Sequence, residues 1–87
     1  MPPRLPPRAR SQSSPEVAFG QVLRQIRAGR SLSQDELAFR AGYHRTYIGQ
    51  LERGEKSPSL RTIYNLAKTL GMAPSEFLRK VEHLLTS

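Results

Sequence analysis

Residues 34–51 read QDELAFRAGYHRTYIGQL and carry the most informative pattern in the chain. This pattern predicts two short helices that cross closely on a tight turn. Such a crossing needs a small residue at the contact, here Ala38, and a glycine at the turn, here Gly42, which can adopt the left-handed backbone conformation. It also needs apolar anchors on the second helix, and Ile48 and Leu51 supply them. All four residues stand at the offsets that this geometry requires.

Three further helices accompany this pair, so the sequence predicts an all-α domain of five helices. Their starts and stops are marked locally: Pro15 suits a first helical turn, and Ser33 with Glu36 forms a capping box. Apolar residues recur at helical spacing, and no alternating pattern typical of strands is present. The predicted helices cover residues 14–28, 33–41, 44–53, 59–70 and 74–85.

The chain divides into a tail over residues 1–15 and a helical domain over residues 16–87. Five of the seven prolines and three arginines lie in the tail, which predicts a disordered or polyproline-like segment. Three roles are open for it: an inert or nonspecific electrostatic aid, which we favour, an arm that brings its arginines to nucleic acid, or a proline-rich ligand, since residues 3–8 fit an SH3-type pattern.

The composition narrows the classes of function. Fourteen Lys and Arg against seven Asp and Glu leave a net charge of +7, which favours a polyanionic partner, with nucleic acid ahead of a membrane surface. The absence of cysteine excludes disulfides and thiolate metal sites, and we expect no cofactor and no metal. No apolar run of about 20 residues and no signal peptide is present, so we expect a soluble, cytoplasmic protein.

The crossing pair matches the DNA-binding helix-turn-helix, and residues 16–78 resemble the Cro and phage-repressor family. The stretch LERGEKSPSL, residues 51–60, is similar to that family's loop after the recognition helix. Within the family, HRTYIG at residues 44–49 is most similar to controller proteins of restriction–modification systems. The resemblance implies a regulator of transcription that binds double-stranded DNA and is not an enzyme. It also implies an ion pair between Arg27 and Glu52 that ties the recognition helix to the first helix.

The recognition helix, residues 44–53, has one polar, basic face and one largely apolar face. At about 100° per residue, one arc of about 140° holds Arg45, Thr46, Gly49, Gln50 and Arg53. Arg45 can bond to guanine O6 and N7, Gln50 to adenine or a phosphate, and Thr46 to a thymine methyl or a phosphate. Glycine inside a helix costs about 1 kcal/mol relative to alanine, so Gly49 indicates a close approach to DNA. For His44 a capping role and a base contact are equally open.

Phosphate contacts are expected around this helix. The resemblance assigns one to Gln34, and a helix N-terminus does attract anions. The other candidates lie around the recognition helix or in the following loop and helix start: Arg40, Arg53, Lys56, Ser57 and Arg61. Arg40 is the weakest of them, because a solvated arginine on the outer face of its helix explains it equally well.

The remaining aromatic and apolar residues are assigned to packing and to a dimer. Phe39, Tyr43 and Tyr64 are expected to pack, and Tyr47 to be partly buried. On the last helix one arc of about 120° can serve the core of one chain or a two-fold dimer. We expect a homodimer on a pseudo-palindromic operator, because similar proteins dimerise through this helix. Its predicted interface residues are Phe77, Leu78, Val81, Leu84 and Leu85.

One rival function remains open, an antitoxin that binds a toxin and also regulates its own promoter. The same fold serves both, so the transcription machinery and a toxin are both candidate protein partners. No long extension that would wrap a toxin follows the last predicted helix. An enzyme would need a nucleophile–base pair or a metal cluster, and the acidic residues are instead scattered along the chain.

Overall fold

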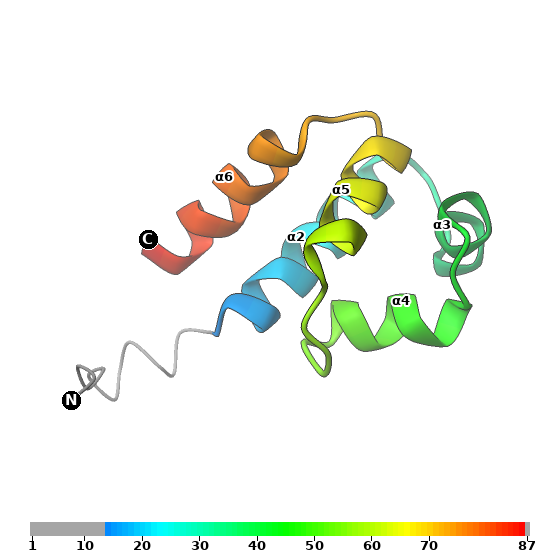
Figure 1. Cartoon of the computed structure of the whole chain (residues 1–87), viewed down its shortest axis with the longest axis horizontal. Coiled ribbons are helices and arrows are strands. Elements are labelled where there is room, and N and C mark those ends of the chain that lie inside the picture. Colours follow the sequence, from blue (N-terminus) through cyan, green and yellow to red (C-terminus); the bar gives the residue numbers. More distant parts are fainter. Residues whose placement is uncertain (1–13, 87) are drawn as a thin grey trace.

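The computed structural model describes residues 14–86, and within them it contains five helices and no strand (Figure 1). The helices are α2 (Pro15–Gly29), α3 (Gln34–Ala41), α4 (Arg45–Glu52), α5 (Leu60–Thr69) and α6 (Pro74–Thr86). The predicted all-α, five-helix class is therefore confirmed. Residues 1–13 of the predicted tail fall outside the described residues, and Pro15 is the first residue of α2, as its predicted place in a first helical turn requires.

Local signals in the sequence set the helix ends. The Ser14 hydroxyl accepts a hydrogen bond from the Val17 amide at 3.1 Å and caps α2. At α3 the predicted capping box is complete, since Ser33 Oγ accepts from the Glu36 amide at 3.0 Å and Glu36 Oε1 accepts from the Ser33 amide at 2.8 Å. Gly42 ends α3 with φ +82°, the left-handed conformation expected at this turn.

The core forms around α2, which packs against α4 and α6, while α3 packs against α4 and α5. Figure 1 shows α4 and α6 on opposite sides of α2. The rings of Phe19 and Phe77 meet with their centroids 4.9 Å apart. The largest fully buried side chains come from all five helices: Val22, Leu23, Leu37, Ile48, Leu51, Leu66 and Phe77.

Two residues predicted for the dimer interface belong instead to this core. Phe77 is 0% exposed and Val81 is 6% exposed, because α6 turns them toward α2. Leu84 is partly buried and also packs against the core. Among the five predicted interface residues, only Leu78 and Leu85 are exposed, at 40% and 37%.

Two aromatic residues predicted to pack are on the surface. Phe39 is 87% exposed on the outer side of α3, because Leu37, Ala38 and Ala41 fill the inner side of that short helix. Tyr64 is 57% exposed on α5. Tyr43, in contrast, packs partly buried against the core as expected.

At Gly20 the backbone of α2 closely approaches the backbone at the end of α4. A Cβ atom built at Gly20 would lie 2.6 Å from the carbonyl oxygen of Glu52, and it would also clash with the Leu51 carbonyl. The absence of a side chain there lets α2 touch the C-terminal turn of α4. The sequence pattern indicated Ala38 and Gly42 as the small residues of the crossing helices and did not indicate this contact at Gly20. Among the described residues, no helix is long and apolar enough to cross a membrane.

Candidate nucleic-acid interface

Helix α4 presents one face to solvent and one to the core, as its sequence predicts. Ile48 and Leu51 are completely buried against α2 and α3. On the other side Arg45 and Thr46 are exposed, and Gln50 is half-buried. The structure therefore places three of the predicted base-contacting side chains on one accessible side of the helix.

The N-terminus of α4 is held by His44. Its Nδ1 accepts a hydrogen bond from the Thr46 amide at 3.0 Å, so His44 is the N-cap residue. The capping role left open by the sequence is thus the one present, with the imidazole still exposed beside Arg45. Arg45 Nε lies 3.5 Å from Asp35 Oδ1, but the two side chains are 62% and 74% exposed. Solvent screens such a pair, so Arg45 remains free to turn toward a ligand.

Gly49 does not present the bare backbone that the sequence suggested. It is buried, and a Cβ at this position would lie 3.1 Å from a guanidinium nitrogen of Arg53, one helical turn later. The glycine therefore makes room for the Arg53 side chain along the face of α4. Close approach to DNA at Gly49 would require Arg53 to move away.

Arg53 forms an exposed ion pair with Glu55, whose Oε2 accepts a hydrogen bond from Nε at 2.7 Å. This hydrogen bond lowers the pKa of Glu55 below its usual value and raises the pKa of Arg53. The other predicted phosphate ligands around the helix, Arg40, Lys56, Ser57 and Arg61, are all exposed. Cationic side chains thus lie on α3, on the loop after α4 and on the first turn of α5.

The ion pair between Arg27 and Glu52 is present and joins α2 to α4. Arg27 Nε and Nη2 donate to the two oxygens of Glu52 at 2.6 and 3.0 Å, and Nη1 donates to the Leu32 carbonyl at 2.7 Å. Hydrogen bonding to Glu52 raises the pKa of Arg27. Gln34 Nε2 also donates to Glu52, at 2.9 Å. The amide predicted to hold a phosphate is therefore engaged with Glu52 in this structure.

One polar group at the back of the helix-turn-helix was not found from the sequence. Among the described residues, Thr62 of α5 is the polar residue that is buried, and it contacts Tyr43 and Tyr47. Asn65, one turn later, donates to the Ala41 carbonyl at 2.8 Å. The signal was weak: a threonine and an asparagine at i and i+3 on a helix that otherwise turns apolar residues inward.

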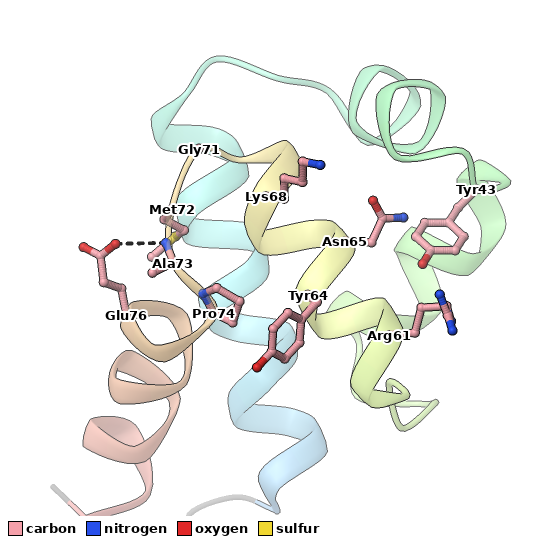
Figure 2. Close-up of a pocket in the computed structure, with 10 residues that line it drawn as sticks. All are labelled: Tyr43, Arg61, Tyr64, Asn65, Lys68, Gly71, Met72, Ala73, Pro74 and Glu76. Carbon is pink, nitrogen blue, oxygen red and sulfur yellow. Dashed lines mark hydrogen bonds between the residues drawn. The ribbon is translucent and has the colours of Figure 1, made fainter.

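An open hollow of about 760 Å³ runs along α5 and the connection to α6 (Figure 2). Tyr64, Arg61 and Lys68 line it from α5, and Tyr43 lines it from the turn before α4. No residue of α4 lines this hollow, so it is a separate surface from the exposed face of that helix.

Known proteins share the arrangement of α3, the turn at Gly42 and α4. A family model described as "Helix-turn-helix" matches residues 23–77, which include α3, the turn, α4 and α5. The chain belongs to this helix-turn-helix family. It is similar to the control protein C.BamHI of Bacillus amyloliquefaciens, with 48% identity over 63 residues, 71% of this chain and 78% of that protein. Together with its regulatory relatives, this makes the chain a DNA-binding regulator.

Solved structures of helix-turn-helix proteins agree with this assignment. The restriction–modification controller protein C.AhdI of Aeromonas hydrophila matches with a TM-score of 0.68 and 46% identity, over 70% of this chain and 92% of that one. The controller C.Esp1396I, crystallised as a tetramer on its natural 35-base-pair operator, matches with a TM-score of 0.78 over 86% of this chain and 99% of that one. At 21% identity, that second likeness shows the fold alone.

Proposed function

We propose that this helix-turn-helix protein binds a pseudo-palindromic operator as a homodimer and controls transcription from it, with α4 in the major groove. The observation that carries the proposal is the exposed side of α4, where Arg45 and Thr46 are free of the core that holds Ile48 and Leu51. The major groove admits an α-helix and displays a distinct donor and acceptor pattern for each base pair. The protein acts by binding, and no catalytic step is involved.

Within this function, each exposed group receives a role by its chemistry. Arg45 reads guanine through two donors, Gln50 reads adenine or bonds to a phosphate, and Thr46 contacts a thymine methyl or a phosphate. His44 and Gly49 face the same groove once the Arg53 side chain moves away from Gly49. The phosphate ligands are Gln34, Arg40, Arg53, Lys56, Ser57 and Arg61, and Gln34 can use its second amide hydrogen while the first stays on Glu52.

The regulated genes are proposed to be those of a restriction–modification system. C.AhdI, 46% identical to this chain, is named as a restriction–modification controller protein, and C.BamHI, 48% identical, is named as a control protein. An antitoxin would instead copurify with an unrelated, stably bound protein, and such a partner would favour that alternative.

The dimer is proposed to form through exposed apolar side chains of α5, extended by those of α6. Leu60 and Tyr64 are 68% and 57% exposed and stand one turn apart on α5. Helix α5 follows α4 after a short loop, whereas α6 lies across α2 from α4 (Figure 1). A two-fold axis near α5 therefore lets both copies of α4 face the same side of the duplex.

The decisive experiment compares Arg45→Ala with Lys56→Ala on two duplexes, an operator selected by the protein from random DNA and an unrelated sequence. Arg45→Ala should lose about 1–3 kcal/mol on the operator and relax the preference at one position of each half-site. Lys56→Ala should weaken both duplexes alike and make the slope of log K against log salt shallower by about one unit.

Two outcomes of this experiment would contradict the proposed function. Equal loss on operator and random DNA for Arg45→Ala would show that this side of α4 does not read bases. A wild-type salt slope near zero would remove DNA binding itself from the proposal.

A further inference from the structure

The buried hydroxyl of Thr62 has no evident role in the core. Thr62 is 6% exposed on the inner side of α5, one turn before the fully buried Leu66. A valine would fill the same space, and a buried hydroxyl costs free energy unless it finds hydrogen-bond partners. The role of the Thr62 hydroxyl therefore lies in the groups to which it is hydrogen-bonded.

Three other hydroxyl groups meet Thr62 Oγ1. Ser59 Oγ donates to it at 3.0 Å, Tyr43 Oη donates at 3.3 Å, and Tyr47 Oη lies 3.3 Å away. A threonine oxygen accepts two hydrogen bonds and donates one. Because Ser59 and Tyr43 use the two lone pairs, the Thr62 hydrogen goes to Tyr47, and the capacity of this oxygen is complete.

The two tyrosines belong to different parts of the helix-turn-helix. Tyr43 is in the turn after Gly42, and Tyr47 is in α4, between Thr46 and Ile48. Their rings pack edge to face, with centroids 5.1 Å apart and planes at 60°. Thr62 therefore holds the turn and the recognition helix together from α5.

Asn65 extends this contact to the first helix of the motif. It lies one turn after Thr62 on α5, and its Nδ2 donates to the Ala41 carbonyl at the end of α3, at 2.8 Å. Asn65 and Tyr43 both line the hollow shown in Figure 2. Two polar side chains of α5 thus bind the end of α3, the turn and α4.

We propose that Thr62 is a positioning residue for DNA reading: its hydroxyl sets the rotation of α4 about its own axis by fixing Tyr47. The inference rests on the proposed function, since it concerns how well the exposed side of α4 meets the bases. Successive side chains are about 100° apart around a helix, so a small rotation of α4 turns Arg45 and Gln50 away from their base edges. Phosphate contacts from the loop and from α5 do not depend on this rotation.

The test is Thr62→Val, which keeps the volume and removes the hydroxyl. We expect operator affinity to fall about tenfold, the effect of one to two net hydrogen bonds, while affinity for random DNA stays unchanged. Thr62→Ser, which retains the hydroxyl, should recover most of the operator affinity. Circular dichroism and a thermal melt should show both variants folded, because Tyr43 and Tyr47 are only partly buried and water can replace a lost hydrogen-bond partner.

A double-mutant cycle of Thr62→Val with Tyr47→Phe tests the contact between these two side chains. The cycle remains informative if Tyr47 also touches DNA, because it measures only the coupling between the two substitutions. The two losses of operator affinity should be less than additive if Thr62 acts through Tyr47. Additive losses, equal losses on operator and random DNA, or failure of Thr62→Ser to recover affinity would overturn the inference and leave the proposed function standing. A wild-type protein that selects no sequence from random DNA would instead overturn both.

Discussion

At the residue scale, the Glu52 carboxylate connects three helices through its hydrogen bonds. It ends α4, its side chain is 4% exposed, and it accepts hydrogen bonds from Arg27 of α2 and Gln34 of α3. A buried charge is tolerated only when its partners are in place. Glu52 therefore fastens the end of α4 to both of its neighbours.

Removing either member of the Arg27–Glu52 pair should destabilise the fold. Breaks of fully buried pairs cost about 3–5 kcal/mol, because the remaining charge is left without a partner. The double variant Arg27→Ala with Glu52→Ala should lose less stability than the sum of the single variants in urea unfolding. Arg53→Ala is a matched control, since its pair with Glu55 is more than half exposed and its loss should leave stability unchanged. Strict additivity would argue against the pair as a stabilising unit.

At the scale of elements, the crossing of α2 and α4 depends on a residue without a side chain. Gly20 brings α2 against the carbonyl groups of Leu51 and Glu52, at the end of the recognition helix. Backbone atoms of a packed helix cannot turn aside as a flexible side chain can. The distance between these two helices is therefore set by Gly20.

The variant Gly20→Ala should destabilise the protein by about 1–3 kcal/mol through overpacking, and it should weaken operator binding because α4 is displaced. Gly29→Ala is the control within the same helix, since a Cβ there meets nothing within 4 Å. Alanine is a better helix former, so Gly29→Ala should leave the melting temperature unchanged or slightly higher. Equal melting temperatures for the two variants would show that α2 and α4 can separate at little cost.

At the scale of the whole molecule, α5 connects the proposed dimer surface with the DNA-reading helix. Its outer side carries Leu60 and Tyr64, and its inner side carries Thr62 and Asn65, which hold the helix-turn-helix. In the proposed dimer, α5 would therefore relate the two recognition helices to each other.

Placing a charge in the middle of the α5 surface should separate the protomers. Tyr64→Glu is expected to sediment as a folded monomer and to bind the operator more weakly, because a two-fold interface brings the introduced charge against its own copy. Phe39→Ser is the control: it removes the most exposed aromatic residue, which lies on α3 and outside the proposed interface. A dimer that persists in Tyr64→Glu, or is lost in Phe39→Ser, would place the interface elsewhere.

Local sequence signals suffice to specify the five helices, their ends to within about one residue, and the two faces of α4. The capping box of Ser33 and Glu36, the turn at Gly42 and the spacing of Ile48 and Leu51 act within one or two helical turns, so neighbours in the chain suffice to specify them. The Arg27–Glu52 pair was also anticipated, although from family resemblance rather than from local pattern.

Which residues of each face are buried, and what they contact, depends on how the helices pack against one another. Phe77 and Val81 of α6 turned inward because α2 covers them, whereas Phe39 stayed outside because α3 is already filled by smaller residues. Gly20, Thr62 and the Arg53 side chain over Gly49 have roles that depend on atoms brought close by the packing of helices and turns. Helical periodicity specifies the direction of a side chain around its own axis, but the neighbouring helix determines what that side chain meets.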